Sequence, residues 1–159
     1  MLSFVQGDLL QATEPYIAQG VAEGNQEGMG TGLALKISRR WPEIQAGFKK
    51  FARSGNFKGG GLWSHPGIDG GPGVFYLATQ PDMYHATMPY LRKSLRRLKK
   101  WSAEGGVSAV ALPKIGAGLG KLSWEDQVKP LFVEILSESE THFVVYETFI
   151  NEFEASSSE

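Results

Sequence analysis

Two glycine-rich segments are the parts of this sequence best suited to bind a ligand. GMGTG occupies 28–32 and GAGLG occupies 116–120, and each leads toward a segment with helical patterning. Glycine lets the backbone approach a ligand closely, and successive N–H groups near a helix start form an anion site. Together the loops suit an anion with two phosphates, or with a phosphate and a sugar. Tight turns without a ligand are the alternative for either loop.

The other residues that could do chemistry limit which kinds of ligand site the sequence allows. Lys121 follows the second glycine segment but precedes Leu122 instead of Ser or Thr, so the phosphate loop of nucleotide hydrolases is absent. Asp8 follows a short strand and could accept a hydrogen bond from an exocyclic amine such as that of adenine, or could cap a turn. The three histidines are far apart and have no metal-ligand spacing, so we predict no metal site.

Composition limits the class of protein. The chain has 159 residues, of which 42% are hydrophobic and 21% charged, and its net charge is −1. We expect one domain over 1–150 and a polar tail over 151–159. The lack of cysteine excludes disulfides, thiolate zinc sites and a cysteine nucleophile. No apolar run reaches the length of a membrane span, so we expect no membrane partner. We also expect a monomeric cytoplasmic protein.

Hydrophobic patterning predicts the elements that must position these residues. Strands and helices alternate, and this order predicts an α/β fold with helices on both faces of a mixed or largely parallel sheet. In such sheets ligands bind outside the carboxyl ends of the strands. Strands are expected at 2–6, 16–22, 62–64, 73–79, 107–112 and 142–147, and helices after 32, at 43–52, at 87–101 and from 123 to 136.

The expected helix at 87–101 is unusually basic. Its segment LRKSLRRLKK, at 91–100, holds six cations and no acid. Such a face could contact phosphates. Because the whole chain is nearly neutral, a solvated helix face balanced by acids elsewhere is the more common interpretation.

Four segments together resemble the macrodomain family. They are GDLL at 7–10, GMGTGLALKISRRWPEI at 28–44, FYLATQ at 75–80 and ALPKIGAGLGKLSWED at 111–126. The similarity is greatest to the branch that contains the terminal ADP-ribose protein glycohydrolase and the bacterial antitoxin that removes ADP-ribose from DNA. The resemblance implies a three-layer α/β/α fold with a mixed central sheet, which binds ADP-ribose without a metal or a cofactor.

The resemblance also implies a binding site. Asp8 would bind the adenine amine, Tyr146 would lie near the adenine, and the two glycine segments would enclose the diphosphate and the distal ribose. The complete set that it implies is Asp8, Leu9, Gln19, Gly28, Met29, Gly30, Thr31, Gly32, Thr79, Ile115, Gly116, Ala117, Gly118, Leu119, Gly120 and Tyr146.

The catalytic positions depart from those of the related human-type glycohydrolase. The resemblance implies a lysine directly after the strand's threonine, where this chain has Gln80, and an aspartate in the late loop, where it has Gly120. A lysine adduct is therefore unavailable. Gln80 and Asn25 are our candidates for orienting a water molecule. Glu23 or Glu27 could be a general base, although a solvent-exposed loop glutamate is the simpler interpretation.

Three functions remain open at this point. The first is a hydrolase that removes ADP-ribose from acidic side chains of mono-ADP-ribosylated proteins by attack of an oriented water. The second is a reader that holds ADP-ribose, or an ADP-ribosylated partner, without turnover. The third is removal of phosphate from ADP-ribose 1″-phosphate, which a related branch performs. ADP-ribosylated nucleic acid is a further partner that the sequence allows.

Overall fold

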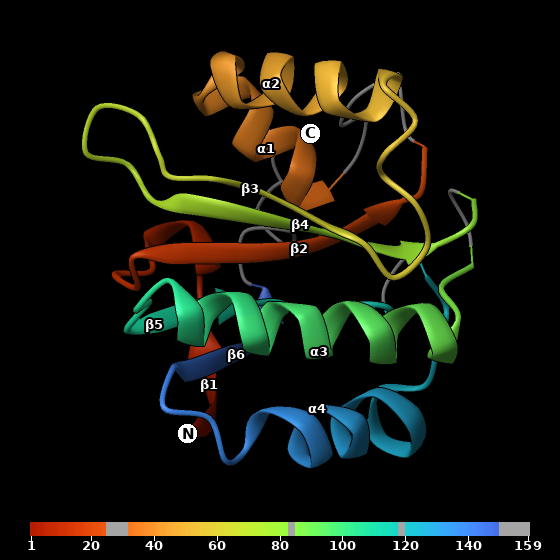
Figure 1. Cartoon of the computed structure of the whole chain (residues 1–159). Helices are drawn as coiled ribbons and strands as arrows, with labels where there is room; N and C mark the ends of the chain where they lie inside the picture. Colours follow the sequence, from red (N-terminus) through yellow and green to blue (C-terminus); the bar gives the residue numbers. More distant parts are fainter. Residues whose placement is uncertain (25–31, 83–84, 118–119, 150–159) are drawn as a thin grey trace, which may run out of the picture.

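A twisted mixed sheet forms the centre of the molecule (Figure 1). The computed structural model describes residues 1–24, 32–82, 85–117 and 120–149. Within them the strand order is β1-β6-β5-β2-β4-β3, and only β3 runs antiparallel to its neighbour. The strands are β1 (Leu2–Gly7), β2 (Tyr16–Ala22), β3 (Leu62–His65), β4 (Gly73–Gln80), β5 (Ala109–Leu112) and β6 (His142–Phe149).

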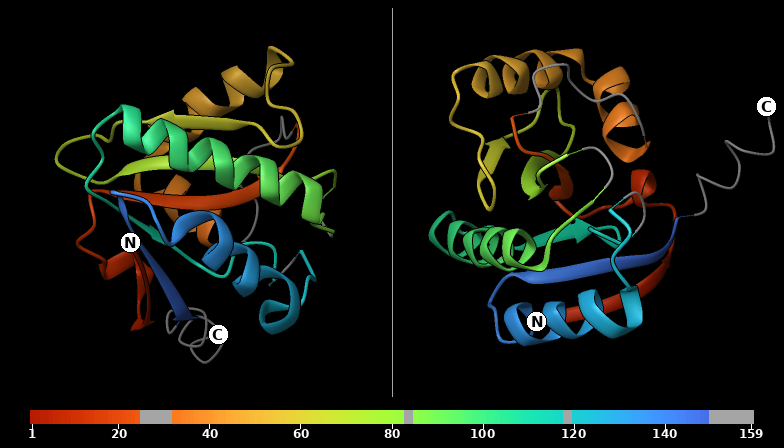
Figure 2. Two further views of the ribbon diagram at one scale, coloured as in Figure 1. Left: turned by 60° about the horizontal axis from the view of Figure 1, so that its bottom comes forward. Right: turned by 90° about the vertical axis from the view of Figure 1, so that its right-hand side faces the viewer.

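Helices cover both faces of this sheet, which confirms the predicted three-layer α/β/α architecture (Figures 1 and 2). On one face lie α1 (Gly32–Arg40) and α2 (Pro42–Arg53). On the other lie α3 (Met88–Glu104) and α4 (Lys129–Leu136). Proline stands at the start of α2, where its missing N–H has no helical partner to lose.

Strand β4 shows how the sheet divides the core in two. All eight of its residues are buried. Phe75 and Leu77 pack with α3 and α4, whereas Val74 and Tyr76 pack with α2. A continuous apolar run of this kind is typical of a strand covered on both faces.

Two short helical turns were not predicted from the sequence. A 3-10 helix, Leu9–Gln11, follows β1 directly. The expected helix after Ser123 begins as a π-helical turn, Trp124–Val128, before α4. Ser123 caps this turn, because its hydroxyl accepts a 3.1 Å hydrogen bond from the Asp126 N–H. Pro130 has no N–H to donate into the preceding turn, which explains why regular α-helical bonding starts late.

Candidate functional site

The carboxyl ends of the parallel strands meet at one edge of the sheet, where the arrowheads of β2 and β4 point in Figure 1. Asp8 follows β1, Gln80 ends β4, and the second glycine-rich segment follows β5. We call residues 115–120 the late glycine segment. Residues predicted from three distant parts of the sequence therefore come to the same edge. This is the edge at which open α/β sheets bind ligands.

Asp8 and Tyr146 form one end of the candidate site. The Asp8 Oδ1 atom accepts a 3.0 Å hydrogen bond from the Leu10 N–H, so the carboxylate caps the short 3-10 helix. Gly7 lies between them, since a Cβ built on it would be 3.7 Å from the Tyr146 ring. Burial and a 2.9 Å hydrogen bond to Glu14 raise the pKa of Tyr146 to about 12. The phenol therefore stays neutral at physiological pH.

The late glycine segment begins as a hydrogen-bonded turn. The Ala117 N–H donates to the Lys114 carbonyl at 3.1 Å, and the Leu122 N–H donates to the Gly116 carbonyl at 2.9 Å. Gly116 has φ of +85°, a conformation that other residues rarely adopt. The turn therefore requires glycine at this position, whether or not a ligand is bound.

Gly120 closes this segment against α3. Its carbonyl accepts a 2.9 Å hydrogen bond from the Ala86 N–H. A Cβ at Gly120 would lie 2.7 Å from the Ala86 Cβ and 2.7 Å from the Gly116 carbonyl oxygen. Real Cβ atoms are not found so close to backbone atoms. The position where the resemblance implies a catalytic aspartate thus has no room for any side chain.

Gln80 is held at the end of β4. Its side-chain Nε2 donates to the Asp82 carbonyl at 2.8 Å, and only 8% of the residue is exposed. This bond fixes the amide so that Oε1 is left as the acceptor among the described contacts. Glutamine cannot attack carbon as a lysine does, but an oriented amide oxygen can hold a water.

Gly20 explains how the late segment reaches β2 and β4. A Cβ at Gly20 would lie 2.6 Å from the Thr79 Oγ1 and 2.8 Å from the Ile115 Cγ2. The glycine therefore allows Ile115, at the start of the late segment, to pack directly on the sheet. Thr79 beside it is fully buried, and its hydroxyl has no hydrogen-bond partner within the described part of the chain. Gln19 is partly exposed on the opposite face of β2.

Glu23 is not the solvent-exposed loop glutamate that we expected from the sequence. The residue is half-buried, and its two carboxylate oxygens accept hydrogen bonds from the Gly59 N–H at 2.7 Å and the Tyr90 hydroxyl at 3.2 Å. Gly59 makes this possible, because a Cβ there would lie 2.1 Å from the Tyr90 ring. This carboxylate holds β2, the segment before β3 and α3 together. In the sequence, the run of glycines at 59–61 is the one feature that points to a close backbone contact here.

Several predicted residues lie outside the described part of the chain. They are Asn25, Glu27, Gly28, Met29, Gly30, Thr31, Gly118 and Leu119, and Gly32 is the first residue of α1. Across the described ranges, no three His, Asp or Glu side chains are grouped as metal ligands. No helix within those ranges is long and apolar enough to cross a membrane.

The chain forms a three-layer α/β/α domain in which the turn around Gly116 and the capping carboxylate of Asp8 lie at one edge of the sheet. No family model matches the chain. The chain is 33% identical over 147 residues to the DNA ADP-ribosyl glycohydrolase of Thermus aquaticus, which covers 88% of this chain and 39% of that protein. It is 26% identical over 150 residues to human OARD1, named an ADP-ribose glycohydrolase, with 91% and 90% covered.

A solved structure shows the family to which this domain belongs. The macrodomain of Thermus aquaticus DarG aligns with a TM-score of 0.80 and 31% identity, covering 92% of this chain and 98% of that domain. This protein therefore belongs to the macrodomain family. It spans less than half the length of the DNA ADP-ribosyl glycohydrolases that it matches.

Proposed function

We propose that this macrodomain binds ADP-ribose at the carboxyl edge of its sheet and hydrolyses the bond between ADP-ribose and its carrier. The observation that carries the proposal is the meeting of Asp8, the turn at 113–117 and Gln80 at that edge. Asp8 would accept from the adenine amine, and the turn would lie along the diphosphate. The activities named for the relatives, ADP-ribose glycohydrolase and DNA ADP-ribosyl glycohydrolase, support the same proposal.

The chemistry that these residues support is attack by water. Gln80 stands where the resemblance implies a lysine, and Gly120 leaves no room for an aspartate. The Gln80 amide oxygen would orient a water, with Asn25 as a second candidate, and a ligand phosphate oxygen would help to hold it. Positioning of this kind lowers the activation barrier by several kcal/mol. When water bonds to the anomeric carbon, the bond from that carbon to the carrier breaks, the carrier leaves with the electron pair, and the proton of the water passes to solvent. When water bonds instead to the acyl carbon of an ester, the ADP-ribose oxygen leaves with the electron pair and takes up a proton.

The carrier that demands least from such a site is an acidic side chain of a modified protein. An ADP-ribosyl ester is labile, and its carboxylate leaves without a general acid. A modified nucleic acid is the second carrier, because two curated relatives of different species are named for DNA. One experiment measures release of ADP-ribose from both carriers.

A reader without turnover is the alternative function. It is favoured by one specific observation, the absence of the lysine and aspartate at Gln80 and Gly120. In that case ADP-ribose would bind at the same edge, and no product would be released.

The test measures free ADP-ribose released from a glutamate-modified protein and from an ADP-ribosylated oligonucleotide. We expect release by the wild type, a large loss of release with unchanged binding in Gln80→Ala, and loss of both in Gly118→Glu. The resemblance implies that position 118 lies beside the diphosphate, where the new side chain would add bulk and negative charge. Gln45→Ala in α2 is the matched control and should behave as the wild type. Tight ADP-ribose binding by calorimetry without release from either carrier would identify a reader. Absence of binding would contradict both functions.

A further inference from the structure

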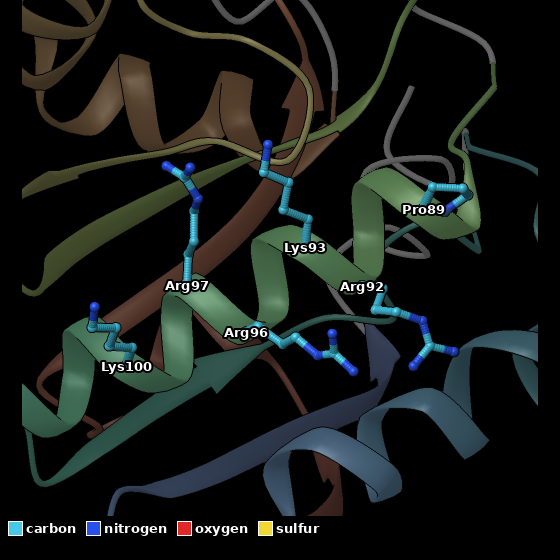
Figure 3. Close-up of a pocket in the computed structure, with 6 residues that line it drawn as sticks. All are labelled: Pro89, Arg92, Lys93, Arg96, Arg97 and Lys100. Atoms are coloured by element: carbon cyan, nitrogen blue, oxygen red, sulfur yellow. The ribbon is translucent and has the colours of Figure 1, made fainter.

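One face of α3 carries only proline and cations. Pro89, Arg92, Lys93, Arg96, Arg97 and Lys100 line a shallow hollow of about 400 Å³ along the helix. Their spacing of three and four residues places them on one side, opposite the buried Leu91, Leu95 and Leu98. We call these six residues the α3 basic face. Figure 3 shows them along the helix, with Lys93 and Arg97 directed to one side and Arg92 and Arg96 to the other.

Few carboxylates neutralise the α3 basic face. Arg92 is paired with Glu134 of α4 at 2.6 Å, and Lys100 lies 4.0 Å from Glu104. Lys93, Arg96 and Arg97 are exposed and have no ion pair with any described residue. Setting aside the five cations of this face, the chain's net charge of −1 becomes −6. Five of the chain's 16 cations therefore lie together on one helix face, and the remaining residues carry a net negative charge, an arrangement that suits a polyanion at this face.

The position of the face connects it to the proposed ADP-ribose site. The first turn of α3 lies against the late glycine segment, because Ala86 is hydrogen-bonded to Gly120 and a Cβ at Gly116 would contact Leu91. From Pro89 to Lys100 the face then runs away from the site for about 16 Å at 1.5 Å per residue. A carrier whose ADP-ribose occupied the site could continue along this helix.

An exposed aromatic ring beside the α3 basic face favours a polyanion that carries bases. Trp101 is 41% exposed, and it packs edge-on against Phe75 with ring centroids 5.3 Å apart. It lies four residues beyond Arg97, at the far end of the row that contains Lys93 and Arg97. Cations that follow a backbone, together with an aromatic ring on which a base can stack, are the usual combination in proteins that bind single-stranded nucleic acid. A peptide of glutamates alone has no ring to stack on the exposed indole.

We propose that the α3 basic face and Trp101 bind the backbone and a base of a single-stranded nucleic acid. This inference rests on the proposed function where it concerns the carrier: the nucleic acid would be the second of the two carriers, guided into the site along α3. The binding surface itself is separate from the ADP-ribose site and is tested without it.

The experiment measures binding of an unmodified fluorescent oligothymidine by anisotropy, over a range of salt concentrations. The test variant is Lys93→Gln/Arg96→Gln/Arg97→Gln. The matched control, Arg39→Gln/Lys50→Gln/Arg53→Gln, removes the same charges from exposed positions of α1 and α2. We expect the test variant to lose at least about tenfold in affinity, and its plot of log affinity against log salt to flatten by about 2, the value for three phosphate contacts of a single strand. The control should change less than about twofold.

Two further measurements make the outcome decisive. Trp101→Leu should weaken oligothymidine binding while the melting temperature, followed by circular dichroism, shows that the fold is kept. Equal losses in the test and control variants, or no binding by the wild type, would overturn the proposal. Equal or tighter binding of a polyglutamate peptide or of anionic lipid vesicles would overturn it in favour of that partner. Calorimetry with ADP-ribose should give the same affinity for the wild type and the test variant, and a lower affinity in the test variant would contradict a separate surface. Absence of ADP-ribose binding by the wild type would contradict the proposed function alone.

Discussion

At the scale of single residues, Asp8 has two roles that a substitution can separate. Its Oδ1 caps the 3-10 helix through the Leu10 N–H, which leaves Oδ2 for the adenine amine. Asp8→Ala should weaken ADP-ribose binding by about 1–3 kcal/mol, the cost of a lost charge-assisted hydrogen bond, and should also lower stability by about 1 kcal/mol through the lost cap. Calorimetry and thermal unfolding measure the two effects.

Asp8→Asn is the control for this pair of roles. An asparagine still caps the helix through its single carbonyl oxygen, so the melting temperature should be close to that of the wild type. The amide has no second oxygen for the adenine amine, so the affinity should still fall. If Asp8→Asn bound ADP-ribose as well as the wild type, Asp8 would be a structural residue only.

A substitution at Gly20 can show how the late glycine segment is held against the sheet. In Gly20→Ala the new methyl group would meet Thr79 and Ile115 at 2.6 and 2.8 Å. We expect a loss of about 1–3 kcal/mol in the free energy of unfolding, as in other overpacked cores, and weaker ADP-ribose binding because Ile115 must move. Denaturant titration and calorimetry measure these effects.

Two variants check the cause of that loss. Thr79→Ala removes a hydroxyl that has no described partner, so it should recover part of the stability when combined with Gly20→Ala. Gly47→Ala adds a methyl group in α2 at 3.4 Å from the Trp63 ring and should be neutral or stabilising. Equal losses at Gly20 and Gly47 would show that steric contact with Thr79 and Ile115 is not the cause.

At the scale of elements, the sequence predicted most of what local patterning can determine. Apolar runs and punctuation by proline and glycine were enough to locate the strands and helices in their correct order. The resemblance placed Asp8 and Gln80 in a common site. What the sequence could not indicate were contacts between distant segments, such as the bonds from Gly59 and Tyr90 to Glu23. These depend on how two loops meet, which no periodicity records.

Glu147 joins β6 to α4, and its charge makes stability depend on pH. Its Oε2 accepts hydrogen bonds from the Trp124 Nε1 and the Lys129 Nζ, both at 3.0 Å. These bonds, with Trp124 the larger cause, hold the pKa of Glu147 below its ordinary value of 4.5. A lowered pKa in the folded state gives stability that is present above pH 4.5 and is lost as the pH falls through the folded value.

Glu147→Gln should therefore cost about 1 kcal/mol at neutral pH, a modest value because the carboxylate is partly exposed. Below pH 4.5 the difference between variant and wild type should shrink. Urea titrations from pH 3 to 7 measure it, with the exposed Glu138→Gln as a control that should follow the wild type. A difference that stayed constant across this range would mean that the ionised carboxylate is not the stabilising group.

At the scale of the whole molecule, one sheet serves two cores. Alternate residues of β4 pack with α2 on one face and with α3 and α4 on the other, and β2 and β5 divide in the same way. Neither core can lose its packing without exposing strands that the other core needs. We therefore expect the chain to unfold as one cooperative unit, as small single domains usually do.

Binding at the sheet edge should then stabilise both cores together. ADP-ribose at 100 times its dissociation constant adds about 2.7 kcal/mol to the free energy of unfolding, which for a domain of this size raises the melting temperature by roughly 5–10 °C. Calorimetric scans should show one transition that moves as a whole. Asp8→Ala at the same ligand concentration should shift less, because it binds more weakly. A scan in which ADP-ribose moved only part of the transition would show that the two cores unfold separately, and an equal shift in Asp8→Ala would place the ligand elsewhere.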